Sequence, residues 1–193
     1  MSSRQRIQSR PELVRNTLIH LEDVEIDLAK SIASLRNSNS REANVKDMKR
    51  DKKRTSLEID YDGAEAELAF FKIAGMYPTP MLNVESKSKV EGTDQGDAIL
   101  DGYVIDVKTT RYKTGMLIQG GPKDFKTNID IYCLITKEYD GVYFLKGFCP
   151  SELFLTEDNY GQHFPGRPCY AVKQNALMDY DTCIKKMLTS CRS

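Results

Sequence analysis

The alternation of apolar and polar residues is clearest over residues 96–110, which read GDAILDGYVIDVKTT. Two short runs of β-branched and apolar residues flank Asp101-Gly102, and this arrangement is the strongest short-range signal for a two-residue hairpin turn. A two-residue loop fixes the register of the hairpin and sets Asp97 opposite Asp106. Because side chains alternate along a strand, Asp97, Asp106 and Lys108 are expected to project from one face.

Further apolar runs predict the rest of a sheet. Residues 129–136, IDIYCLIT, are apolar almost without a break, which indicates a central strand covered on both faces. The other predicted strands are 81–84, 116–119 and 141–149, with an edge strand at 169–173.

Apolar residues spaced three and four apart predict three helices. From Val14 to Leu35 they form a long stripe, which either packs against the core of the chain or forms the seam of a homodimeric coiled coil. A second helix over 61–75 ends at Gly75, and a third follows Asn175 as its N-cap. Helix, hairpin, strands and a last helix predict an α/β fold.

One acid of the second predicted helix lies on its apolar face. Glu67 shares that face with apolar residues one turn away in each direction, whereas Glu65 points elsewhere. A buried carboxylate is costly unless it is paired or binds a metal. We therefore expect Glu67 to form an ion pair with Lys72 or Lys108, or to bind a metal ion.

The opposed acids of the hairpin, Asp97 and Asp106, need a counter-charge. Directly opposed Cβ atoms lie about 5 Å apart, and two carboxylates at that distance repel by about 3 kcal/mol at an effective dielectric near 20. Lys108 supplies one positive charge on the same face. A divalent cation would supply the rest, because carboxylates are the ligands that Mg²⁺ and Mn²⁺ prefer.

The spacing D-x8-D-x-K of these three residues resembles the core of the PD-(D/E)xK nuclease superfamily, and the run from Gly96 is similar to its RecB-like and phage exonuclease branch. The resemblance covers roughly residues 61–148. It implies a restriction-endonuclease-like core, in which a central mixed β-sheet is flanked by helices. Two departures are visible: Gly96 stands where the family has proline, and Asp106 is the shorter of the two permitted acids.

The resemblance also implies a function, a metal-dependent deoxyribonuclease that hydrolyses the phosphodiester bonds of DNA. One or two Mg²⁺ or Mn²⁺ ions would be held by Asp97, Asp106, the carbonyl of Val107 and Glu67. Lys108 would position or deprotonate the attacking water, or stabilise the phosphate. Exonuclease and endonuclease action both remain open. The alternatives are a nuclease-fold protein that binds DNA or a protein partner without cutting, and an interaction module built on the N-terminal helix.

Charge is unevenly distributed, although the formal net charge of the 193-residue chain is zero. Residues 1–56 hold 13 Lys/Arg and 8 Asp/Glu, a balance of +5, and residues 57–193 carry the opposite balance. This division predicts a basic helical N-terminal arm over 1–56, which contacts DNA phosphates, and a nuclease core over 57–193. A solvated linker is the alternative for the basic run. The predicted phosphate contacts are Lys49, Arg50, Lys52, Lys53, Arg54, Arg111 and Lys113.

The remaining composition narrows the class of protein. No apolar run approaches the length of a membrane span, and the chain does not open with a signal-peptide pattern. Five cysteines without C-x-x-C spacing predict reduced, mostly buried thiols, and two histidines far apart in the sequence argue against a histidine metal site. We expect a cytoplasmic protein without a membrane partner, located in the bacterial host if the chain is phage-encoded.

Overall fold

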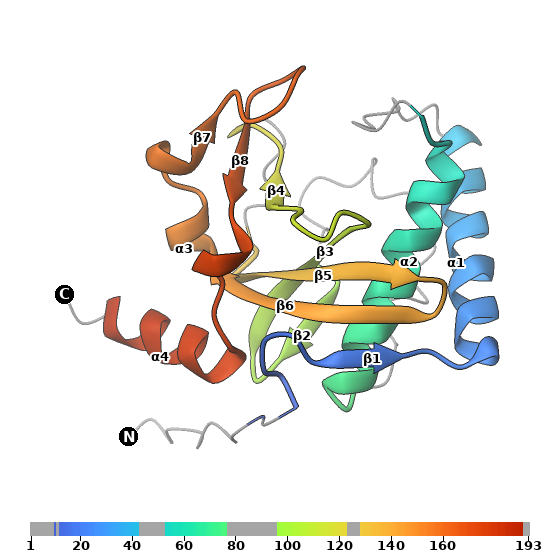
Figure 1. Ribbon diagram of the computed structural model, residues 1–193, viewed down its shortest axis with the longest axis horizontal. Helices are drawn as coiled ribbons and strands as arrows, with labels where there is room; N and C mark the ends of the chain where they lie inside the picture. The colour runs from blue at the N-terminus through green and yellow to red at the C-terminus, as the bar shows by residue number, and fades with distance from the viewer. Residues whose placement is uncertain (1–9, 11, 43–52, 77–95, 123–127, 191–193) are drawn as a thin grey trace.

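The computed structural model describes residues 10, 12–42, 53–76, 96–122 and 128–190 (Figure 1). These residues form an α/β fold built on a curled, mixed five-stranded sheet. The predicted strand at 81–84 lies outside the described residues, as do three of the predicted phosphate contacts, Lys49, Arg50 and Lys52.

The five-stranded sheet has the order β1-β6-β5-β3-β2. Strands β3 and β5 are parallel, and the other neighbours are antiparallel. The apolar run predicted as a central strand is β5, which lies in the middle of the sheet, so this prediction is confirmed. The strands are β1 (Leu18–His20), β2 (Ala98–Leu100), β3 (Tyr103–Thr110), β5 (Ile131–Tyr139) and β6 (Val142–Pro150).

The β2–β3 hairpin has the predicted two-residue turn. Asp101 and Gly102 both have positive φ angles, 52° and 86°, as the turn type favoured by Asp-Gly requires. Leu100 pairs with Tyr103, and the next two pairs follow in the predicted register. The turn is held from outside by Arg10, whose guanidinium lies 2.9 Å from the Asp101 carboxylate.

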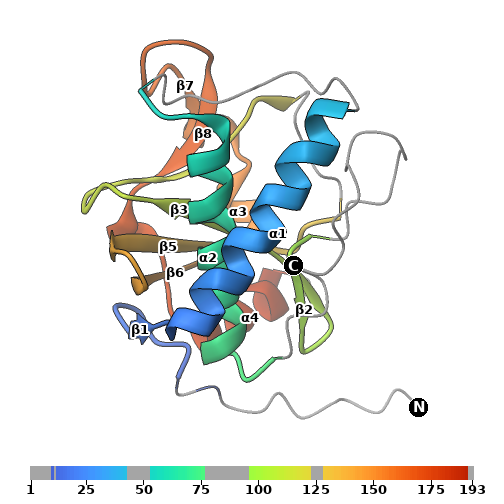
Figure 2. The same ribbon diagram turned by 90° about the vertical axis from the view of Figure 1, so that its right-hand side faces the viewer.

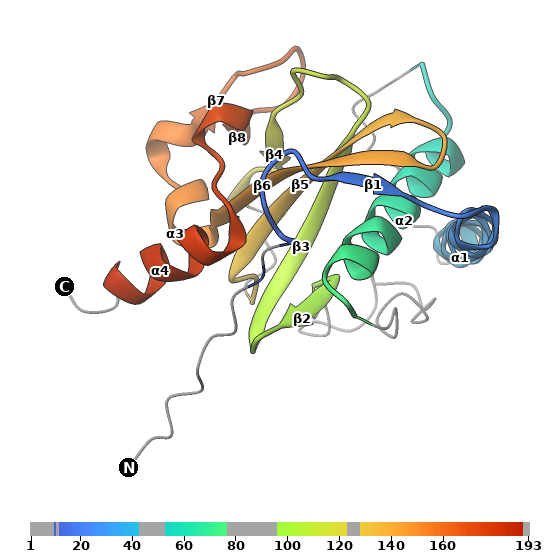
Figure 3. The same cartoon turned by 60° about the horizontal axis from the view of Figure 1, so that its bottom comes forward.

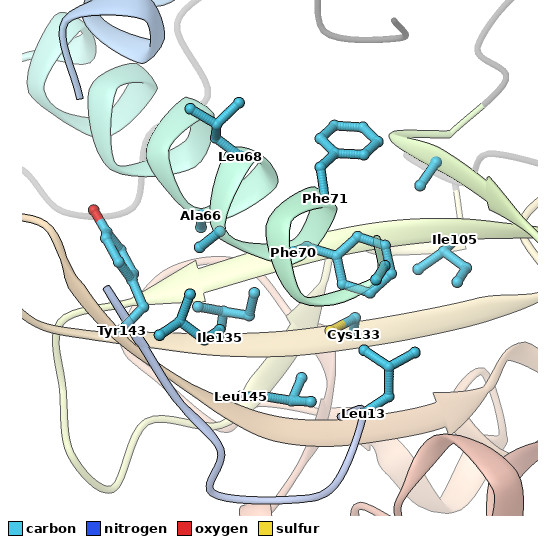
Figure 4. Packing of buried hydrophobic residues seen from close by; sticks show 14 of the residues in the cluster. Leu13, Ala66, Leu68, Phe70, Phe71, Ile105, Cys133, Ile135, Tyr143 and Leu145 are labelled. Carbon is cyan, nitrogen blue, oxygen red and sulfur yellow. The ribbon is translucent and has the colours of Figure 1, made fainter. Parts of the chain in front are cut away.

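Helix α2 (Ser56–Ile73) covers one face of the large sheet. A capping box between Thr55 and Glu58 starts the helix. Gly75 ends it with a φ of 63°, and the N–H groups of Gly75 and Met76 bond back to the last turn. Figure 4 shows how Phe70 and its neighbours on α2 point into an apolar cluster with strand residues such as Cys133. The predicted stop at Gly75 is confirmed.

The N-terminal region differs from its prediction. The stretch before residue 21 is not helical but contributes β1, which pairs with β6 at the edge of the sheet. Helix α1 (Asp23–Glu42) begins only afterwards and packs on the outer side of α2 (Figures 2 and 3). Of the predicted stripe, Leu21 and Ile32 are buried in the main cluster, whereas Leu28 and Leu35 are exposed. Residues 18–42 therefore belong to the same folded body as the β2–β3 hairpin and α2.

A smaller sheet covers the other face of the large one. Its order is β4-β8-β7, with β4 (Leu117–Gln119), β7 (Tyr160–Gly161) and β8 (Cys169–Val172). The predicted edge strand at 169–173 is thus the central strand of this sheet. Short helices α3 (Ser151–Phe154) and η4 (Gln174–Ala176) flank it.

The last helix, α4 (Tyr180–Ser190), packs against β6. Asn175 lies in η4 and does not cap α4, because the chain first forms a bridge between Met178 and Phe148. None of the described helices combines the length and hydropathy that crossing a membrane requires.

Candidate active site

The two faces of β3 pack against different parts of the molecule. Ile105 and Val107 belong to the apolar cluster under α2, whereas Val104 packs with the cluster that holds the small sheet. Since side chains alternate along a strand, Asp106 and Lys108 lie on the face of Val104. The predicted alternation is confirmed, and α2 covers the opposite face from the acid and the lysine.

Asp106 and Lys108 are in direct contact. Asp106 is fully buried, and its Oδ2 lies 2.5 Å from the Nζ of Lys108, whose side chain is 28% exposed. A carboxylate without access to water must be compensated by a positive charge or a metal ion. The contact therefore joins a buried acid to a lysine that reaches towards solvent.

A β-bulge lies at Asp97, where the β2–β3 hairpin begins. The N–H of Asp97 bonds to the carbonyl of Ile105, which is already the partner of Ala98, so two residues of one strand oppose one of the other. Its carboxylate then accepts a 2.7 Å hydrogen bond from the N–H of Val107. Asp97 and Asp106 are thus not a ladder pair, and the strict opposition predicted from the loop length ends one residue early.

Gly96 makes this bulge possible. Its φ is 72°, which side chains rarely tolerate and which proline cannot adopt. A Cβ atom at this position would lie 2.6 Å from the side chain of Val104 and 2.9 Å from the carbonyl of Ile105. A proline could therefore not replace Gly96 in this backbone, so the departure from the PD-(D/E)xK motif at this position is required by the local conformation.

The donors at this end of β3 are oxygens of the kind that Mg²⁺ and Mn²⁺ bind. Because the N–H and C=O of one strand residue point to the same side, the carbonyl of Val107 is directed towards the side on which Asp97 lies. Burial raises the pKa of the Cys133 thiol well above its ordinary range, and the charges of Cys183, Asp106 and Asp97 raise it further. The donor set of Asp97, Asp106 and Val107 fits a hard divalent cation.

Glu67, the third predicted acid of the metal site, is bound by an arginine of α1. Both of its carboxylate oxygens accept hydrogen bonds from one guanidinium nitrogen of Arg36 on α1, at 3.1 and 2.9 Å. Glu67 thus forms an ion pair with Arg36, whereas the two predicted partners are paired with other acids, Lys72 with Glu25 and Lys108 with Asp106. Within the part of the chain that the structure describes, no three acids, histidines or cysteines gather into a metal-binding group.

A second buried charge cluster lies between α2 and the strands β5 and β6. Lys137 contacts Asp62 at 3.0 Å and Glu65 at 2.7 Å, and the hydroxyl of Tyr143 donates to Glu65. Asp62, Glu65 and Lys137 are all buried. Glu65 does not point away from the core as predicted, because α2 is buried over most of its circumference.

Asp62 forms ion pairs with three cations in this cluster, Arg54, Arg111 and Lys137. Burial alone would raise the pKa of Asp62, but hydrogen bonds from Arg111 and Lys137 outweigh it and leave the pKa below its ordinary value. Arg111 binds both carboxylate oxygens, at 2.6 and 2.8 Å, and Arg54 binds one at 2.6 Å. Two predicted phosphate contacts thus have an internal partner. The sequence pattern does not predict this cluster, because its only local signals are two acids three residues apart on α2 and a lysine that closes an apolar run.

The other predicted phosphate contacts in the described chain are Lys53, at the start of the segment before α2, and Lys113. The side chain of Lys113 is 80% exposed and pairs with Glu138 at 2.7 Å. Four of the five cysteines are described, and all four are free and buried, as predicted. No protein-family model, curated protein or solved structure matches the chain.

Proposed function

We propose that this protein is a metal-dependent nuclease that hydrolyses the phosphodiester bonds of DNA, with a restriction-endonuclease-like core. One observation carries the proposal. The β2–β3 hairpin has the predicted turn, and it joins the fully buried carboxylate of Asp106 to Lys108 beside the carboxylate of Asp97. A helix before the hairpin and a parallel strand after it fit the order of such a core.

Asp97, Asp106 and the carbonyl of Val107 would hold Mg²⁺ or Mn²⁺. When bound, the metal would supply a hydroxide-like water and stabilise charge on the scissile phosphate. The Val107 N–H fixes the orientation of the Asp97 carboxylate, so this ligand needs little reorganisation. Because the Asp106 carboxylate is fully buried, its negative charge would interact strongly with the cation.

Lys108 is the residue best placed to act on the substrate. Its Nζ contacts the Asp106 carboxylate, and the side chain is exposed enough for the same ammonium group to contact a bound phosphate. An ammonium in this position orients the attacking water and offsets the negative charge of the transition state. Glu67 is a less supported contributor, since Arg36 holds both of its oxygens.

The same observation on Glu67 favours a second candidate, a nuclease-fold protein that binds DNA or a protein partner without cutting. If an acid from α2 is needed to complete the metal site, the ion pair with Arg36 keeps it away. The two candidates differ in a single property, which is turnover of a phosphodiester bond.

Incubation of the protein with linear, circular, single-stranded and double-stranded DNA in Mn²⁺ or EDTA tests this property. The nuclease predicts cleavage in Mn²⁺ that EDTA stops and that the Asp106→Asn variant lacks. Binding of DNA with every substrate intact would favour the second candidate. Comparison of linear with circular DNA separates exonuclease from endonuclease action.

A further inference from the structure

A surface hollow with a volume of about 370 Å³ lies beyond the end of β3. It is lined by Lys113, Thr114 and Met116 from the segment before β4, and by Lys173, Gln174 and Asn175 after β8. The lining thus holds two ammonium groups, a hydroxyl and two side-chain amides, which are donors that proteins use to bind phosphate oxygens. The proposed active site uses none of these side chains.

The walls of the hollow are fixed by hydrogen bonds and close packing. The side-chain amide of Gln174 donates to the carbonyls of Lys113 and Gly115, at 2.9 and 2.8 Å. A Cβ atom on Gly115 would lie 2.4 Å from the side chain of Thr110 and 2.9 Å from the carbonyl of Tyr112. The segment after β3 is therefore folded tightly onto η4, so the two walls of the hollow are held together.

Two more cations lie beside the hollow. Arg15 donates to the carbonyl of Gln174 at 3.0 Å and to the carbonyl of Lys146 at 3.3 Å. Burial lowers the pKa of Lys146, and the positive charges of Arg15 and Lys113 lower it further, although Glu138 acts against them. Arg15 is thus bonded both to a wall of the hollow and to the strand that carries Lys146.

Among the residues that the structure describes, few acids lie near these four cations. Glu138 pairs with Lys113, and the carboxylate of Asp179 accepts the backbone N–H of Arg15. An ion pair as exposed as that of Lys113 contributes little and exchanges readily with another anion. The described residues of this region keep an excess of positive charge in a chain whose net charge is zero.

The hollow borders the small sheet, and that sheet packs on the face of the large sheet that carries the acid–lysine pair. Leu117 and Val172 are paired across β4 and β8, and they pack with Leu134 in the cluster on the Lys108 face. Met116 and Lys173, which line the hollow, directly adjoin that pair. Lys108 and Lys113 belong to one continuous segment of chain that runs from β3 into the hollow.

We propose that this hollow binds a phosphate of the DNA backbone next to the phosphate that is cut. The proposal rests on the proposed function, because it takes DNA as the substrate. It assigns backbone binding to Lys113 and Lys173, with Arg15 and Lys146 adding to the field. Arg54 and Arg111 take no part, since Asp62 binds both of them.

Binding of a fluorescently labelled DNA duplex, measured by anisotropy in EDTA at several salt concentrations, tests the assignment without cleavage. The double variant Lys113→Gln/Lys173→Gln is compared with Lys30→Gln/Lys185→Gln, which removes the same charge from exposed positions on α1 and α4. We expect a severalfold higher Kd for the first variant only. Its slope of log K against log salt should fall by about 0.9 for each phosphate that the variant no longer neutralises.

Equal Kd values and equal slopes for the two double variants would overturn the assignment, as would a wild-type protein that binds no DNA. Cleavage is measured separately in Mn²⁺. A wild-type protein that binds through these lysines but never cuts would refute the nuclease and leave the binding site standing. If the wild-type protein cuts DNA but the Lys113→Gln/Lys173→Gln variant binds DNA with an unchanged Kd, only the binding site is refuted.

Discussion

The carboxylate of Asp97 accepts a hydrogen bond from the backbone N–H of Val107 at 2.7 Å. The side chain thus takes the place of a strand carbonyl at the residue just before β2 begins. Asp97 therefore has two separable roles, as the acceptor for the backbone and as a proposed ligand of the metal. The two roles respond differently to substitution.

Asp97→Ala removes the acceptor and leaves the N–H of Val107 without its partner. We expect the free energy of unfolding to fall by about 1–3 kcal/mol, the usual cost of an unsatisfied buried donor. Asp97→Asn keeps a carbonyl oxygen in the same place and should lose less. Urea denaturation measures both values, and an alanine variant as stable as the asparagine variant would contradict the structural role.

Gly96 and Gly63 provide a matched pair of glycines. Gly96→Ala forces a side chain into a positive-φ position that is already filled, and it should destabilise the protein by more than the ~1–2 kcal/mol of left-handed backbone strain. Gly63 lies inside α2 with open space around it, so Gly63→Ala should stabilise by about 0.5–1 kcal/mol. Thermal melting should show a lower melting temperature for Gly96→Ala and a higher one for Gly63→Ala. A Gly96→Ala variant that is more stable than wild type would refute the bulge.

The Asp62 cluster makes stability depend on pH. The pKa of Asp62 is lowered below its ordinary value of 3.8, so the unfolded chain takes up a proton more readily than the folded protein. The contribution of ionised Asp62 to the free energy of unfolding is complete at pH values above 3.8, and it is lost as the pH falls through the lowered pKa. Asp62→Asn removes this dependence and, by leaving three cations without their shared partner, costs about 3–5 kcal/mol at neutral pH.

Urea unfolding of wild type and Asp62→Asn at neutral pH and at about pH 3 measures both effects. Wild type should lose more stability than the variant between the two conditions. Equal losses would show that other carboxylates account for the acid sensitivity. Asp140, whose pKa is also lowered by its contact with Lys137, titrates in the same direction but is largely exposed.

Lys108→Met keeps most of the side-chain stem and removes the charge. If Lys108 acts on the attacking water or the phosphate, cleavage should fall by about 10²–10⁴-fold, the usual contribution of a positioned acid or base. The shift in melting temperature on adding Mn²⁺ should persist, because Lys108 is not a ligand. Near wild-type cleavage by the variant, with Lys30→Met as a control, would exclude a catalytic role.

The elements that the sequence predicts well depend on neighbouring residues. The hairpin follows from the Asp101-Gly102 turn, and the end of α2 follows from Gly75; both signals act within a few residues. The run that forms β5 is apolar on both faces, so its central position is visible without knowledge of its partners.

Several of the predictions that the structure contradicts involve partners that are distant in the sequence. The spacing of apolar residues before Leu21 fits a helix, but the segment finds a strand partner in β6, more than a hundred residues away. The spacing along α2 alone directs Glu65 away from the core, because its partner Lys137 lies on another element. Arg36 binds Glu67 across two helices whose packing no local pattern specifies.

The most direct test of the central claim, that Asp106 binds a divalent cation, is a melting scan with and without Mn²⁺. A ligand that binds only the folded state at a hundred times its Kd adds about 2.7 kcal/mol, which for a chain of this size is about 5–10 °C. Wild type and the control Asp27→Asn, an exposed acid on α1, should show this shift. Asp106→Asn should show much less, and a shift equal to that of wild type would contradict the claim.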